Sequence, residues 1–264
     1  MTDPLLPPEL ERQIFLCALN NSRQDVQNLL SVAERVQTWL IPALYEVVAF
    51  HSEYWTPFPF TKERYERYGK EARHLLVGTD DMIPYLSLFP NVTNLALWTG
   101  NDESLLGILE QLPLTRLSTT LHTFNPPTSA LIRTFSNITH LEIVGGLDHE
   151  RDCLQLLRHF TSLTHLCVLW EFNDEDLKKI LTCHPSTSLK VLILWDSTNN
   201  LKDDDPTVGL SPLDLRDREL DDIRVVALEY NIIKDWENGA RGDMDMWIFA
   251  ENVVAERRLE SIRN

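Results

Sequence analysis

The stretch FSNITHL at residues 135–141 is nearly copied twice, as FTSLTHL at residues 160–166 and as FPNVTNL at residues 89–95. Each copy contributes to a triplet in which an apolar residue is followed three positions later by a second and two positions after that by a third. Seven such triplets occur: Ala72, Leu75, Val77; Val92, Leu95, Leu97; Leu114, Leu117, Thr119; Ile138, Leu141, Ile143; Leu163, Leu166, Val168; Leu189, Leu192, Leu194; and Ile223, Val226, Leu228. A single match arises often by chance, whereas several in register indicate a repeated structural unit.

The spacing of the triplets predicts the architecture. Their middle positions are 75, 95, 117, 141, 166, 192 and 226, so the intervals are 20, 22, 24, 25, 26 and 34 residues. Leucine-rich repeats have periods of about 20 to 29 residues, each with one short strand and a helical or irregular return. We therefore predict an α/β fold: a leucine-rich-repeat solenoid over residues 71–231, with a curved parallel sheet of about seven strands and a helical convex side. Its core column should contain Leu95, Leu141, Leu166, Leu192 and Val226.

Composition restricts the classes of partner. The chain has 264 residues, 43% hydrophobic and 24% charged, with a formal net charge of −16. This charge would repel a phosphate backbone, so we expect no nucleic-acid partner and no anionic membrane partner. No apolar run is long enough to span a bilayer, and the N-terminus lacks a secretory signal, which favours the cytoplasm or nucleus. The four cysteines form no C-x-x-C pair, which favours buried thiols over a disulfide or metal framework.

Three segments lie outside the repeats. Residues 1–50 show two amphipathic helical stretches, the second being either two helices or one kinked near Pro42. Residues 51–70 are an aromatic linker that we expect to cap the first repeat, and residues 232–264 should form a C-terminal cap with one amphipathic helix starting at Asp243. Within the repeats, an acidic insertion near residues 197–217 is predicted to be a solvated loop rather than a calcium site.

The N-terminal residues resemble an F-box-like motif. The matching phrases are LPPEL at residues 6–10, IF at residues 14–15 and LLSVAERVQTW at residues 29–39, ending at residues 44–45. The pattern is similar to the divergent version found ahead of repeats in proteins of mushroom-forming (basidiomycete) fungi. The phrase DWENGA at residues 235–240 also resembles that family. The chain departs from many F-boxes in carrying its tryptophan at position 39 instead of four residues after Val32.

This resemblance implies a non-catalytic substrate receptor of a cullin-RING (SCF-type) ubiquitin ligase. Its helices would dock on the Skp-type adaptor, and its repeats would bind an unidentified protein substrate. The adaptor contacts, or their direct supports, would be Leu6, Pro7, Leu10, Ile14, Val32 and Leu44. Two alternatives stay open: a stand-alone leucine-rich-repeat binding protein without a ubiquitin-ligase link, and an unrecognised enzyme or metalloprotein.

The concave face of the sheet is the predicted partner-binding surface. Side chains alternate between the two faces of a strand, so the residues between the triplet members should point away from the core. This places a polar and aromatic surface on the open side, made of Trp98, His140, Glu142, His165 and Trp195.

Two strands should bring potentially reactive groups together on that face. His140 and His165 should be neighbours, and with Glu142 and Cys167 they have the residue types of a zinc site or a Cys–His nucleophile pair. Duplication of the repeat phrase accounts for the histidines without chemistry, and the chain has no standard catalytic motif. We therefore expect no catalytic residue, no metal and no cofactor.

Overall fold

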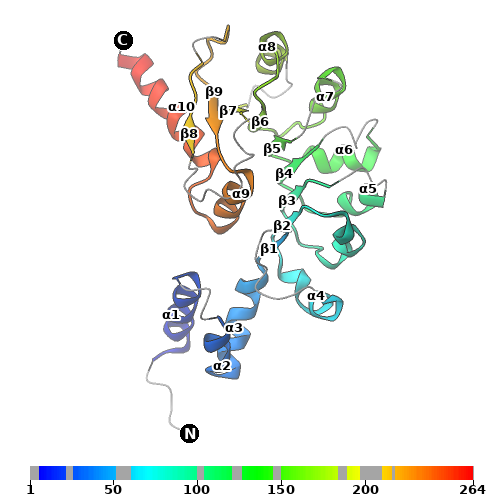
Figure 1. The fold of residues 1–264 in the computed structure, drawn as a ribbon, viewed down its shortest axis with the longest axis vertical. Coiled ribbons are helices and arrows are strands. Elements are labelled where there is room, and N and C mark those ends of the chain that lie inside the picture. The colour runs from blue at the N-terminus through cyan, green and yellow to red at the C-terminus, as the bar shows by residue number, and fades with distance from the viewer. Residues whose placement is uncertain are drawn as a thin grey trace.

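The computed structural model describes residues 6–21, 26–51, 61–99, 104–120, 127–144, 150–183, 189–196, 210–215 and 218–263. They contain one nine-stranded sheet in the order β1-β2-β3-β4-β5-β6-β7-β9-β8. Eight strands run parallel: β1 (Val47–Phe50), β2 (His74–Val77), β3 (Asn94–Leu97), β4 (Arg116–Thr119), β5 (His140–Ile143), β6 (His165–Leu169), β7 (Val191–Trp195) and β9 (Val225–Glu229). The short β8 (Ser211–Pro212) pairs antiparallel with β9 at one edge. The strands form a curved stack, an α/β arrangement consistent with a solenoid (Figure 1).

The predicted leucine column is present, except at its last member. The column residues, each at most 2% exposed, pair in register from strand to strand: Leu75, Leu95, Leu117, Leu141, Leu166 and Leu192. On β9, however, Leu192 pairs with Val225, so the prediction for Val226 is wrong. A shift of one residue exchanges the two faces of a strand. Both faces of β9 are buried and apolar, so the alternation of polar and apolar residues could not fix its register.

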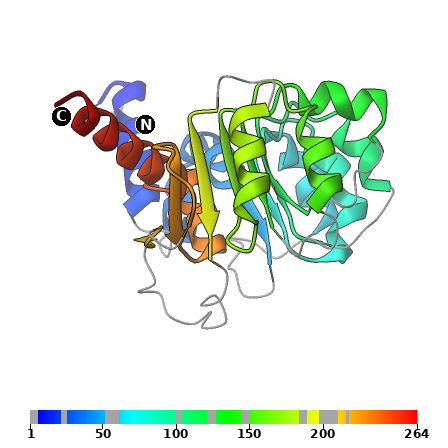
Figure 2. The ribbon, with the colours of Figure 1, turned by 90° about the horizontal axis from the view of Figure 1, so that it is seen from above.

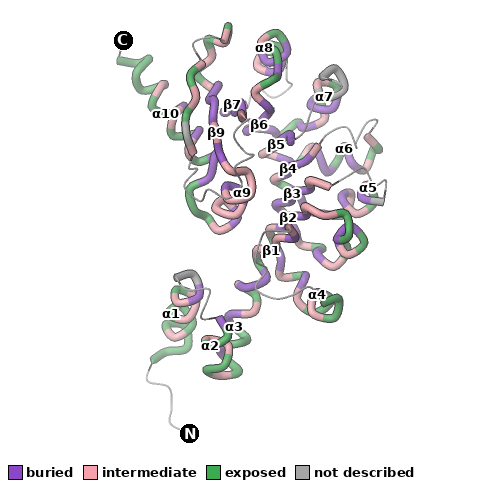
Figure 3. Tube along the Cα trace, viewed as in Figure 1, coloured by how far each residue is buried: buried purple, intermediate pink, exposed green. Residues whose placement is uncertain are grey.

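Helices return the chain between strands on the convex side. They are the 3₁₀ helix η3 (Asp80–Leu88), α5 (Ser104–Leu109), α6 (Ser129–Phe135), α7 (Glu150–Leu157) and α8 (Asp174–Cys183). In Figure 1 they line the outer side of the curved sheet. Phe135 and Phe160, the first residues of two copies of the repeat phrase, stack with ring centroids 4.6 Å apart. Buried residues concentrate along the strands, while the outer helix surfaces are exposed (Figure 3).

A ladder of threonines joins the repeats at the entrance to the strands. The hydroxyls of Thr93, Thr115, Thr139 and Thr164 each donate to the carbonyl of the equivalent residue one repeat earlier, at 3.1–3.3 Å. The same carbonyls also accept the backbone N–H groups of the threonine and of the residue after it. Threonine therefore recurs in the phrase because its hydroxyl lies beside a carbonyl that already fixes the register of neighbouring strands.

The N-terminal segment contains three helices and then a strand. The helices are α1 (Pro8–Asn21), α2 (Val26–Ser31) and α3 (Glu34–Tyr45), so the second predicted stretch is two helices, with Pro42 inside the latter. Residues 47–50, expected to be part of the helical segment, instead form β1 and pair with β2. The sheet thus begins before residue 71. The run VVAF is too short to show a repeat spacing, but its β-branched residues favour a strand.

Aromatic rings connect the helical segment to the first repeat. Tyr65, on α4 (Lys62–Tyr68), lies 5.4 Å from the rings of both Phe50 and Phe89 and 5.8 Å from that of Tyr45. A 3₁₀ turn, η2 (Gly69–Glu71), then leads toward β2. Residues 52–60 of the predicted aromatic linker lie outside the described residues, as do 197–209 and 216–217 of the acidic insertion.

The chain ends in two helices instead of the one expected. They are α9 (Ile232–Arg241) and α10 (Met246–Arg263), which we call the C-terminal cover. Gly242, with φ of 79°, ends α9, and its N–H donates to the carbonyls of Asn238 and Gly239. This left-handed position suits glycine and turns the chain, so Asp243 lies in the turn and is not the N-cap of a single helix. Figures 1 and 2 show both helices on the side of the sheet opposite α5–α8.

No helix in the described part of the chain is both long enough and apolar enough to cross a membrane.

The register of β9 gives a direct test of the fold. Val225 is fully buried in the core, whereas Ile223 is 44% exposed although it belongs to the predicted triplet. We expect Val225→Ala to lower the free energy of unfolding by about 2 kcal/mol, because it removes buried methyl groups. Ile223→Ala should change it by about 0.5 kcal/mol or less. Urea denaturation of both variants measures the difference, and a larger loss for Ile223→Ala would contradict the observed register.

Candidate functional site

The C-terminal cover occupies the concave face along most of the sheet. At one end, Trp236 and Ala240 of α9 pack on Leu76 of β2 and Ala96 of β3. At the other end, α10 contributes Met246, Trp247, Ala250 and Val254 to a second cluster. The sheet side of that cluster is made by side chains of β6, β7 and β9 together with residues that follow strands, including Cys167, Ile193, Trp195, Leu228 and Tyr230. The concave face is therefore an intramolecular interface.

This cover changes the interpretation of the predicted recognition surface. Glu142, His165 and Trp195 are 4%, 3% and 5% exposed, while Trp98 and His140 are partly exposed. The expectation that the five residues form an open surface is wrong, because the chain's own C-terminal helices pack on it. Trp195 stacks on Tyr230 with ring centroids 5.4 Å apart, so its truncation should destabilise the protein and not leave folding unchanged. Contact of these residues with a partner stays a prediction, and such a contact would require displacement of the cover.

The two histidines are neighbours, as predicted. His140 and His165 pair across β5 and β6, and their rings stack with centroids 4.1 Å apart and an interplanar angle of 1°. The ring of Trp247 meets both imidazoles at nearly right angles. Nε2 of His165 lies 3.0 Å from Oε1 of Glu251 on α10. The two histidines are thus part of the surface of the sheet on which the cover packs.

Burial disfavours the charged form of both imidazoles. It lowers the pKa of His140 to about 2, with further lowering by His165, Arg116 and Lys190. Burial also lowers the pKa of His165, although Glu251 opposes this change. Protonation of His140 between pH 7 and 5.5 is therefore unfavourable while the cover is in place.

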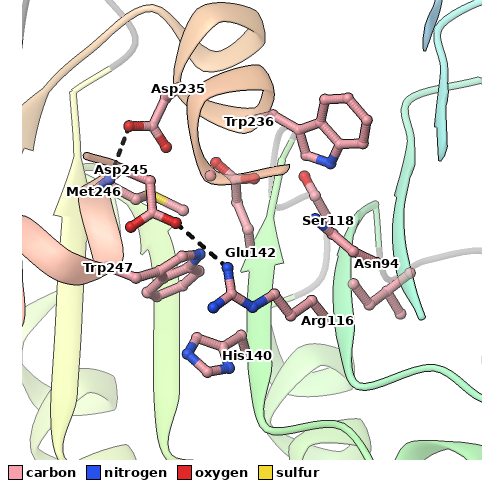
Figure 4. A pocket seen from close by; sticks show the side chains of 12 residues that line it. Asn94, Arg116, Ser118, His140, Glu142, Asp235, Trp236, Asp245, Met246 and Trp247 are labelled. Atoms are coloured by element: carbon pink, nitrogen blue, oxygen red, sulfur yellow. Dashed lines mark hydrogen bonds and ion pairs between the residues drawn. The ribbon is translucent and has the colours of Figure 1, made fainter. Parts of the chain in front are cut away.

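A small polar cavity lies where the turn between α9 and α10 meets the sheet. Its volume is about 30 Å³, and acidic groups converge on it from three elements (Figure 4). Arg116 of β4 forms an ion pair with Asp245 at 3.3 Å. Asp235 of α9 accepts the N–H of Met246 at 2.8 Å, and Tyr230 donates its hydroxyl to Glu142 of β5 at 2.7 Å. The three carboxyl groups are 2–6% exposed.

Burial favours the uncharged forms of two of these acids, Glu142 and Asp235. Burial raises the pKa of Glu142 to about 7 and raises that of Asp235 well above its usual value, and the nearby acids add to both increases. Burial likewise raises the pKa of the Cys167 thiol, which lies 3.3 Å from the Tyr230 hydroxyl. A thiol held uncharged is a poor nucleophile and a poor metal ligand. The described residues contain no group of three or more His, Cys, Asp or Glu able to hold a metal ion. Cys17, by contrast, is exposed, contrary to the expectation of buried thiols.

The predicted adaptor-binding residues form a second candidate surface. Leu6, Leu10, Ile14 and Val32 are 43%, 49%, 54% and 58% exposed, and Pro7 is exposed beside them. Leu44 is buried in the core, so it can act only as a support. Arg35 of α3 binds Glu11 of α1 at 2.6 Å, which holds the two helices together. In Figure 1, α1–α3 project from one end of the sheet.

Comparison with known proteins gives no family assignment. No family model matches the chain, and no curated protein matches it.

Sequence reasoning did not predict the acidic cavity. Its lining comes from two distant parts of the sequence, which meet only when the cover reaches the concave face: Arg116 and Glu142 on the strands, and Asp235, Asp245 and Trp247 near the C-terminus. One signal was available, namely a glycine inside an otherwise helical stretch. A Cβ at Gly239 would lie 2.4 Å from Oδ2 of Asp245, so the helix approaches this carboxylate more closely than a Cβ would allow.

Gly239 therefore provides a test of the cavity geometry. Alanine normally stabilises a helix relative to glycine by about 1 kcal/mol. Gly239→Ala should instead lower the free energy of unfolding by about 1–3 kcal/mol, because the new methyl group displaces the carboxylate that binds Arg116.

Gly107 of α5 is the matched control, since a Cβ there would meet no atom within 4 Å. Gly107→Ala should raise the free energy of unfolding by about 0.5–1 kcal/mol. Thermal and urea denaturation of both variants measure these changes. If Gly239→Ala raised the free energy of unfolding as much as Gly107→Ala does, the turn would not lie against α9.

Proposed function

We propose that this protein is a non-catalytic interaction module, a substrate receptor of a cullin-RING ubiquitin ligase. In this proposal, residues 1–50 are an F-box-like segment that docks on a Skp-type adaptor in the cytoplasm or nucleus. The body is a leucine-rich-repeat solenoid that carries an unidentified protein substrate. The described repeats have the triplet spacing and parallel strands that such a body requires.

The exposed apolar edge of the N-terminal helices is the observation that carries the proposal. Leu10 and Ile14 lie one helical turn apart on α1, and Val32 lies between α2 and α3. All three are about half exposed, although the same helices bury Leu19, Val36 and Leu40 in the core that continues into the repeats. An apolar edge that remains exposed beside a completed core is typical of a protein-binding surface. The residues coincide with those that the F-box resemblance assigns to the adaptor.

The substrate surface differs from the open concave face predicted from the sequence. Because the cover packs on Trp195 and His165, a substrate meets either the outer surface of the body or a concave face from which the cover has moved. The proposed ligase role therefore depends first on adaptor binding. The edge of the N-terminal helices that we propose for this contact is exposed.

A charge at the centre of the edge should prevent adaptor binding. Leu10 is 49% exposed, so Leu10→Asp should leave the fold intact. Burial of an unpaired carboxylate at the adaptor contact should weaken binding by roughly 100-fold or more. Calorimetric titration of a purified Skp-type adaptor into the wild-type and variant proteins measures this, with circular dichroism to confirm folding.

Ile262→Asp is the matched control, since Ile262 is an exposed apolar residue on α10 (80% exposed) outside the proposed edge. It should bind the adaptor with wild-type affinity. Equal affinity of the Leu10→Asp variant and the wild type would place the contact elsewhere. Absence of binding by the wild-type protein would favour a stand-alone repeat protein.

A further inference from the structure

The C-terminal cover closes over a site with an excess of buried acid. Glu142, Asp235 and Asp245 are 4%, 6% and 2% exposed and line one cavity of about 30 Å³. Arg116 is the cation among the described residues that line it, and it pairs with Asp245. Glu142 and Asp235 are therefore left without a positive partner in that lining. Two ionised carboxylates in such a place would be strongly unfavourable.

The two acids come from opposite sides of the interface. Glu142 extends from β5 of the sheet, whereas Asp235 belongs to α9 of the cover and accepts the first N–H of α10. Figure 4 shows both carboxyl groups directed toward the same space, with Met246 and Trp247 beside them. Repulsion between them acts across the contact that holds the cover on the sheet.

We propose that the C-terminal cover is a proton-dependent closure: it rests on the concave face while Glu142 and Asp235 are uncharged, and their ionisation releases it. This inference concerns the cover alone and does not depend on adaptor binding. Release would expose the apolar concave residues around Trp195 and Cys167.

The neighbouring groups determine the direction of the pH effect. Glu142 faces Tyr230, Cys167, Asp245 and, across the cavity, Asp235. The raised pKa values of the two acids mean that the closed state holds protons that an open state loses. Closure is therefore most stable near or below the unperturbed carboxyl pKa and weakens as the pH rises toward the raised values.

The stacked histidines act in the opposite direction at low pH. Burial disfavours protonation of both His140 and His165, and the charges of Arg116 and Lys190 add to this. His165 also disfavours the charged form of His140, whereas Glu251 partly offsets the effect for His165. Acidification below about pH 6.5 therefore favours an open state in which the imidazoles are solvated. A comparison of each variant with the wild type at the same pH cancels this histidine effect.

The test uses Glu142→Gln and Asp235→Asn in the full chain. Both amides have the shape of the protonated acid, and the amide introduced by Asp235→Asn keeps an oxygen to accept the N–H of Met246. Hydrogen exchange of the α10 amides, corrected for the intrinsic rate at each pH, measures cover opening. With the pKa of Glu142 at about 7, the ratio of wild-type to Glu142→Gln opening should rise about 50- to 100-fold between pH 5 and 8.5. Asp235→Asn should show a rise in the same direction.

Labelling of Cys167 by a disulfide reagent provides a second readout, because this thiol is buried beneath α10. Its rate, located by mass spectrometry and divided by that of free cysteine, should follow the exchange data. Glu256→Gln is the matched control, since Glu256 is an exposed acid on the same helix. Its ratio to the wild type should be constant with pH.

Two results would overturn the proposal. One is a ratio that changes less than about threefold between pH 5 and 8.5 for either folded variant. The other is increased exchange in α10 while Cys167 stays protected, which would indicate fraying of the helix and not release of the cover. If one variant fails to fold by circular dichroism, the other decides the outcome alone.

Discussion

A strand presents alternate side chains to the two faces of its sheet, and in the last strands of this protein both sets are apolar. On β9, Val225 and Ala227 pack toward the convex helices while Val226 and Leu228 pack toward α10. Water cannot cover either face without a large loss of hydrophobic free energy. The sheet therefore needs a second layer on its concave side, and the C-terminal helices supply it. The position of α10 follows from this requirement, and α9 extends the same cover over β2 and β3.

Local repetition explains which features the sequence could predict. The leucine column and the pairing of His140 with His165 follow from copied phrases of nearly constant spacing, which the threonine ladder holds in register. The face of the sheet on which Val226 lies could not be predicted. The final interval is longer than the repeat period, and both faces of β9 are apolar. A C-terminal cap over the last repeat was predicted, but its position along the concave face was not, since that face is normally inferred to be open from the repeat alone. The prediction that Trp195 is exposed was wrong for the same reason.

The N-terminal helices show a different limit of sequence reasoning. Leucine and isoleucine positions on α1 repeat at helical spacing, but spacing does not tell which apolar residues enter the core. The structure buries Leu19 and exposes Leu10 and Ile14 on the same helix. It also buries Leu44, which the resemblance had grouped with the contact residues. The apolar pattern thus predicted the helices, and the three-dimensional packing separates their inner and outer faces.

Polar groups in the concave interface fix where the cover rests. A wholly apolar contact between α10 and the sheet would tolerate sliding, whereas the ion pair of Arg116 with Asp245 has one geometry. Asp235 accepts the N–H of Met246, a contact that lies within the cover and fixes α10 relative to α9. These contacts require carboxyl groups to be buried, and one arginine neutralises one of them. Asp235, which fixes α10 relative to α9, is also one of the two acids, with Glu142, to which we attribute the sensitivity of closure to protons.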